Sequence, residues 1–147
     1  MAYTLNNIID LISTFQSNHK QLKVGSFYFG RLPDSLSEQD IRYPTLLIEP
    51  LPSVIEEGIE RFVFKCFVLD LATHERENEK DSLSDTKLIS NDLIAYFKNQ
   101  YFNNNLSVEH TVTMTPLIGA LSDLCNGWEF DLVFKQFNSY NNCQIPD

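Results

Sequence analysis

Two stretches of the chain carry apolar residues three and four positions apart, the pattern of an amphipathic helix. The first covers about residues 3–17, and Thr4 is placed to cap it. The second begins at Ser82, with Asp85 three residues later as in a capping box, and ends before the asparagines at 103–105. The apolar stripes consist of Leu5, Ile8, Ile9, Ile12 and Phe15 in the first stretch and of Ile89, Leu93, Tyr96 and Phe97 in the second.

Five other stretches have the composition or the alternation of β-strands. They are residues 23–30, 44–50, 59–70, 106–115 and 127–137. The prolines at both ends of the second stretch predict its limits, because proline cannot donate to a strand ladder. The last two stretches alternate apolar and polar residues, as half-buried antiparallel strands do.

The stretch 59–70 has two different faces. Phe62, Phe64, Cys66 and Val68 form an apolar face, which we expect to belong to the core. The other face mixes Arg61 and Lys65 with apolar residues such as Phe67. A mixed face is typical of contact with another layer or another subunit, and coverage by a local helix explains it equally well.

The order of these elements predicts an α+β fold. Two helices packed on one face of a mainly antiparallel sheet of about five strands would bury the apolar side of both layers. The 147 residues fit a single domain, residues 1–147, with a short C-terminal tail over about residues 138–147. Turns or loops are expected at residues 31–43, 51–58 and 71–81.

The composition supports a folded chain and limits its partners. Apolar residues make up 43% of the chain and aromatic residues 12%, enough for a core that needs no disulfide or metal. The net charge of -9 and the absence of a basic run argue against nucleic-acid binding and against binding to anionic membranes. No signal peptide and no apolar run of ~18 residues is present, so we expect a soluble protein. Three widely spaced cysteines favour a reducing compartment.

The sequence contains no recognisable catalytic, cofactor or metal motif. His19, His74 and His110 are far apart; we expect His110 in the interior and the other two at the surface. The acidic residues at 75–81 lack the glycine and the final glutamate of a calcium loop. Cys125 is flanked by acidic and neutral residues, which does not favour a reactive thiol. We therefore predict a protein that is not an enzyme and binds no cofactor.

The C-terminal half carries a resemblance to a known family. A helix over Ser84–Ile94 and a threonine-rich strand are followed by Asp123-Leu124-Cys125-Asn126-Gly127-Trp128, a strand over Glu129–Phe137 and a tail ending in Cys143-Gln144-Ile145-Pro146. This arrangement resembles the tail-terminator or tail-completion proteins of tailed bacteriophages, including those of crAss-like phages of Bacteroidetes. The similarity covers roughly residues 82–146, and the N-terminal half matches in the order of its elements.

The resemblance implies a structural subunit of the virion. Such proteins form homo-oligomeric rings, here of six- or twelve-fold symmetry, that join the portal and neck to the tail. Genomic DNA passes through the channel without specific binding, and an acidic lumen would repel its phosphates. The loop at 71–81, or Glu56 and Glu57, would face the lumen or a basic patch on the adjoining ring. The protein would be made in the host cytoplasm, would reside in the neck or tail of the virion and would contact no membrane.

Six residues are candidates for contacts with other subunits: Arg61, Lys65, Phe67, Trp128, Ile145 and Pro146. Trp128 has an alternative role as a core anchor, and Gly127 before it would supply a positive φ for a turn. Two other functions stay open. One is a small protein-binding adaptor that uses the mixed strand face. The other is an enzyme with an unfamiliar site around His110.

Overall fold

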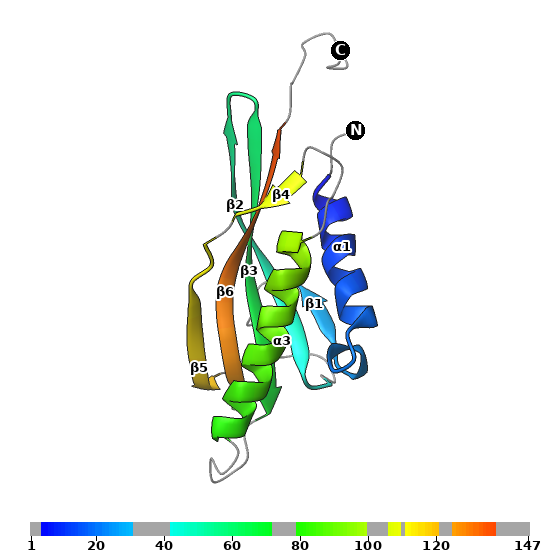
Figure 1. The fold of residues 1–147 in the computed structure, drawn as a ribbon, viewed down its shortest axis with the longest axis vertical. Helices are drawn as coiled ribbons and strands as arrows, with labels where there is room; N and C mark the ends of the chain where they lie inside the picture. The colour runs from blue at the N-terminus through cyan, green and yellow to red at the C-terminus, as the bar shows by residue number, and fades with distance from the viewer. Residues whose placement is uncertain are drawn as a thin grey trace.

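Both helices lie on one face of a single sheet, as Figure 1 shows. The structure is a computed structural model, and it describes residues 4–30, 42–71, 79–99, 106–109, 111–120 and 125–137. The elements are α1 (Leu5–Asn18), the 3₁₀ turn η1 (Leu22–Val24), β1 (Phe27–Phe29), β2 (Thr45–Glu56), β3 (Ile59–Leu71), α3 (Glu79–Asn99), β4 (Leu106–Val108), β5 (Met114–Ala120) and β6 (Cys125–Phe137). The predicted α+β fold, with two helices on a mainly antiparallel sheet, is confirmed.

The sheet has six strands, one more than the five we predicted, in the order β1-β2-β3-β6-β4, with β5 also paired to β6. The β1–β2 pair is parallel and the other pairs are antiparallel. The extra strand arises because the predicted strand at 106–115 divides in two. Val108 of β4 pairs with Phe134 and Met114 of β5 pairs with Phe130, so the two short strands follow different parts of β6.

The core lies between the helices and the sheet. The predicted apolar face of β3 is fully part of it, with Phe64, Cys66 and Val68 at 0% exposure. Phe134 of β6 is central, with edge-to-face ring contacts at 6.0 Å to Phe64 and 5.4 Å to Phe97 of α3. Such contacts add to the area that the rings bury, by about 0.5–1.5 kcal/mol for each pair. The core confirms most of the two apolar stripes as the helix faces that meet the sheet. Leu5 and Tyr96 are the exceptions, since they are 41% and 39% exposed.

β2 does not end at Pro50 as we predicted, but continues through Pro50 and Pro52 to Glu56. The Leu46 N–H donates to the Ser26 carbonyl at 3.0 Å, so it points to the side where β1 lies. Pro50 is four residues further on, so its ring nitrogen points to the same side, where β1 has already ended. A strand tolerates proline where the missing N–H would face no partner.

Other predicted limits change by a few residues. Thr4 caps α1 in a reciprocal capping box with Asn7, which confirms the predicted start of this helix. The second helix begins at Glu79, and Ser82, the predicted first cap, lies buried inside it. The strand predicted at 23–30 is shorter, since residues 23 and 24 belong to η1 and β1 covers Phe27–Phe29.

Gly127 lies within β6, and the positive-φ glycines among the described residues are Gly30 and Gly58, so the predicted positive φ at Gly127 is wrong.

Candidate functional site

The end of the β2–β3 hairpin, residues 53–61, forms a projection that we call the arm. It extends past the ends of both helices in Figure 1. Val54 and Ile55 on the arm are 44% and 66% exposed, and Phe137, paired with Ile59 directly after the hairpin turn, is 55% exposed. Val54 and Ile55 are consecutive strand residues, so their side chains point to opposite faces of the hairpin. The arm therefore exposes apolar side chains on both faces, which makes it a candidate contact surface.

Arg61, a predicted contact residue, ties the arm to the rest of the sheet. Its guanidinium lies 3.2 Å from Glu56 Oε2 and 3.2 Å from Glu109 Oε1. Hydrogen bonds to these two carboxylates raise the pKa of Arg61 above its ordinary value. Arg61 therefore has two partners within its own chain, one on the arm and one just after β4.

Lys65 lies on the sheet face that the helices leave uncovered. It sits between Glu49 of β2 and Asp131 of β6 in the strand register. It also lines a hollow of about 240 Å³ together with Thr113, Thr115, Glu129, Phe130 and Asp131. This uncovered face is half-buried and carries both charges, as expected from the mixed pattern of β3.

Phe67 and Trp128 have interior contacts. Phe67 is 3% exposed and packs with Leu47 and Leu69 in a small second core, so it offers little surface to a partner. The Trp128 indole N–H donates to the Leu83 carbonyl at 2.9 Å, and the Lys87 ammonium lies 5.4 Å from the ring centre. These contacts favour the alternative role of Trp128, an anchor that fastens α3 to β6.

Several candidates lie outside the described residues: Ile145, Pro146, His74, His110, the tail at 138–147 and most of the loop at 71–81.

A pocket between the end of α1 and the middle of α3 was not predicted from the sequence. Its volume is about 560 Å³. Its lining residues are Phe15, Asn18, His19, Lys20, Gln21, Asp92 and Tyr96. Phe15 and Tyr96 form an aromatic wall with ring centres 5.1 Å apart. A pocket of this size with an apolar wall and a polar rim is typical of a binding site.

His19 and Asp92 form the closest polar contact of the pocket, with Nε2 and Oδ2 2.9 Å apart. The imidazole Nδ1 accepts from the backbone N–H groups of Gln21 at 3.2 Å and Leu22 at 3.3 Å. The proton of the neutral ring is therefore on Nε2, where it is donated to Asp92. Our prediction of a solvated His19 is wrong, since its side chain is only 12% exposed. Both ring nitrogens already have partners, so the dyad joins α1 to α3 and leaves no free base.

Lys20 stands at the rim of this pocket and is exposed. Its ammonium has no ion pair with any residue that the structure describes. The pocket thus combines an aromatic wall with one ammonium, Lys20, and one carboxylate, Asp92, of which the carboxylate already accepts from His19. The ammonium, without an ion pair in the described chain, suits an occupant with an apolar and an acidic group.

The described residues hold two buried cysteines, Cys66 and Cys125. Burial, with a smaller effect from Asp131, raises the pKa of the Cys66 thiol far above its ordinary value, so this thiol is unreactive in the folded state. Among the described ranges, no group of three or more His, Cys, Asp or Glu side chains is arranged to hold a metal ion. No helix of the described chain has the length and apolarity needed to cross a bilayer.

The sequence matches no protein-family model and no curated protein sequence.

Proposed function

We propose that this chain is a structural subunit of a ring in the neck or tail of a tailed bacteriophage. In this role it has no catalytic activity and is made in the host cytoplasm. Copies of the chain would form a closed six- or twelve-fold ring between the portal or neck proteins and the tail. The ring would let genomic DNA pass through its channel and would contact no membrane.

The observation that supports this proposal most is the arm. A projecting hairpin with exposed Val54 and Ile55 is a poor surface for a monomer in water. The pairs from Arg61 to Glu56 and Glu109 hold the arm in a defined position on the sheet. A preorganised apolar projection loses little entropy when it docks on another subunit, which favours assembly.

The charge of the chain suits a channel for DNA. Its 20 acidic residues against 11 basic ones give the net charge of -9. Carboxylates that face the lumen would repel the phosphates and prevent DNA from adhering. Glu56 and Glu57 on the arm remain candidates for the lumen or for a basic patch on an adjoining ring, although Arg61 already pairs with Glu56.

A second candidate function is a small protein-binding adaptor. The uncovered sheet face favours it, because Lys65, Thr115 and Asp131 surround a hollow that a side chain of a partner could enter. An adaptor of this kind would stay monomeric and would bind through that face.

Peptide mass spectrometry of purified phage particles from the source, with imaging of the same particles, tests the proposal. We expect this chain at a few to a dozen copies in each particle, and density at the axis between portal and tail. Presence in infected or host cell lysate together with absence from particles would exclude the ring and favour the adaptor.

A further inference from the structure

The arm and the pocket between α1 and α3 have complementary chemistry. The tip of the arm presents Ile55, 66% exposed, beside Glu57 at the hairpin turn. The pocket presents the aromatic wall of Phe15 and Tyr96 beside the ammonium of Lys20. Each surface therefore carries an apolar part and a charge, Glu57 on the arm and Lys20 in the pocket, and the pocket lining also includes the carboxylate of Asp92, which accepts from His19.

Neither charge has a partner within the described chain. Glu57 is exposed at the turn and forms no ion pair with a described residue, in contrast to Glu56, which pairs with Arg61 at 3.2 Å. Lys20 likewise lacks an ion pair in the described part of the chain. Asp92, which also lines the pocket, lies 2.9 Å from His19.

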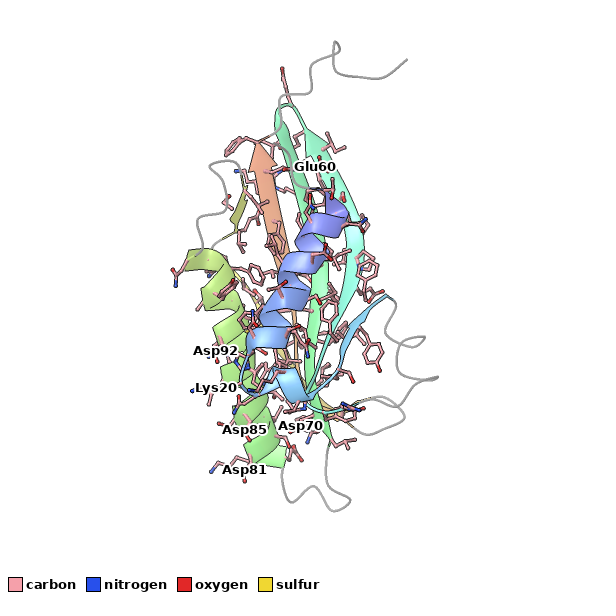
Figure 2. All side chains as sticks on the ribbon, turned by 90° about the vertical axis from the view of Figure 1, so that its right-hand side faces the viewer. Lys20, Glu60, Asp70, Asp81, Asp85 and Asp92 are labelled. Carbon is pink, nitrogen blue, oxygen red and sulfur yellow. The ribbon has the colours of Figure 1, made fainter. Side chains whose placement is uncertain are left out.

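One chain cannot bring the two surfaces together. Figure 2 shows Glu60, which pairs with Ile55 in the strand register, near one end of the molecule, while Lys20 and Asp92 lie toward the other end. A contact between them needs two copies, the arm of one in the pocket of the next. Such a contact is heterologous, and repeated around an axis it closes a ring.

We infer that the pocket receives the arm tip of a second copy of this chain, with Ile55 against Phe15 and Tyr96 and Glu57 paired to Lys20. The volume of about 560 Å³ is more than one aliphatic side chain fills, so the end of the hairpin enters with both residues. This inference rests on the proposed ring and names the surfaces that would join its subunits.

Charge exchange tests the pairing of Glu57 with Lys20. We expect Lys20→Glu and Glu57→Lys each to weaken self-association at least about tenfold at roughly 50 mM salt, because each places like charges together. The double variant Lys20→Glu/Glu57→Lys should restore it. Lys23→Glu, an exposed lysine that does not line the pocket, is the matched control and should assemble like the wild type. Sedimentation velocity and native mass spectrometry measure the assembly, and circular dichroism checks that each variant is folded.

Mixing two defective chains tests the direction of the contact. Ile55→Asp removes a working arm but keeps the pocket, and Lys20→Glu weakens the pocket but keeps the arm. Ile55→Asp should weaken association about 30-fold or more, as for a buried contact at an interface centre. At a protein concentration at which the wild type assembles and the weakened Lys20→Glu does not, we expect each variant alone to be monomeric. An equimolar mixture should form one-to-one dimers and nothing larger.

The outcomes separate this inference from the proposed function. If the wild type assembles and Ile55→Asp and Lys20→Glu assemble equally well, the arm–pocket contact is wrong. The proposed ring is then unaffected, because its subunits would join through other surfaces. If the wild type stays monomeric at all concentrations, the contact is also wrong, and the composition of phage particles still decides the ring.

Discussion

The structure predicts that adding a single methyl group at Gly127 is strongly destabilising. It pairs with Leu69 at the centre of the sheet. A Cβ at this position would lie 1.9 Å from the Val68 carbonyl oxygen, 2.9 Å from its carbon and 3.0 Å from the Leu69 Cα. All three atoms belong to the backbone, so no side-chain rotation can make room.

Gly127→Ala must therefore push two central strands apart. Overpacking of a well-packed core costs typically about 1–3 kcal/mol, and here the atoms that must move are fixed by the ladders of β3 and β6. We expect a loss in the free energy of unfolding of about 3 kcal/mol or more, a large part of the roughly 5–15 kcal/mol of a typical domain.

Gly58→Ala is the matched comparison, because the same methyl group is expected to destabilise the protein for a different reason. Gly58 has a φ of +75°, and no atom lies within 4 Å of the added Cβ. The left-handed conformation alone costs about 1–2 kcal/mol for an L-residue. Gly127→Ala should therefore be clearly the more damaging of the two.

Urea unfolding measures both variants, followed by the fluorescence of the single tryptophan, Trp128, and by far-UV circular dichroism. With a slope of about 1–3 kcal/mol per molar urea, the midpoint of Gly127→Ala should fall by about 1 M or more. A Gly127→Ala protein that is unfolded without urea also agrees with the prediction. A loss below about 1 kcal/mol, no larger than for Gly58→Ala, would refute the close approach of β3 and β6 at this point.

Three further predictions concern other parts of the sheet. Arg61→Ala should speed amide hydrogen exchange in the arm, because both carboxylate contacts are lost, and Arg61→Lys should have a smaller effect; unchanged exchange would contradict the role of Arg61 as a tie. Burial raises the pKa of Asp70, so its charged form is less stable in the folded chain, and Asp70→Asn should raise stability at pH 7. This gain in stability should shrink as the pH falls through the raised pKa, because wild-type Asp70 then takes up a proton in the folded state. Thermal melts of both proteins across the acidic range measure the gain, and a gain that stays constant would contradict the prediction. Cys66 and Cys125 should resist alkylation in the folded protein and react after denaturation, as peptide mass spectrometry can measure for each residue, and rapid labelling of either in the native state would place it at the surface.

Properties that depend on local spacing could be predicted from the sequence. The alternation of Phe62, Phe64, Cys66 and Val68 defined the core face of β3, since the direction of strand side chains has a period of two. The Thr4 cap was also predictable from local spacing, because its partner Asn7 is only three residues away. The α+β class followed from the order of such local patterns.

The candidate site depended on contacts between distant parts of the chain. His19 and Asp92 are 73 positions apart, and no local pattern indicates that α1 ends beside the middle of α3. The pocket was missed for this reason. The contacts of Arg61 and the burial of Phe67 likewise depend on which strands lie beside β3.

Pro50 and Gly127 show most clearly which properties the sequence determines and which depend on the tertiary structure. The sequence by itself determined that Pro50 has no N–H to donate and that Gly127 has no side chain. Only the tertiary structure decided that Pro50 directs this missing donor to the side where β1 has ended, so that β2 continues past it. It also decided that Gly127 faces the backbone of Val68, so that its absent side chain leaves room for the close approach of two strands. The chemistry of a residue is local, whereas its consequence depends on which partner the fold places next to it.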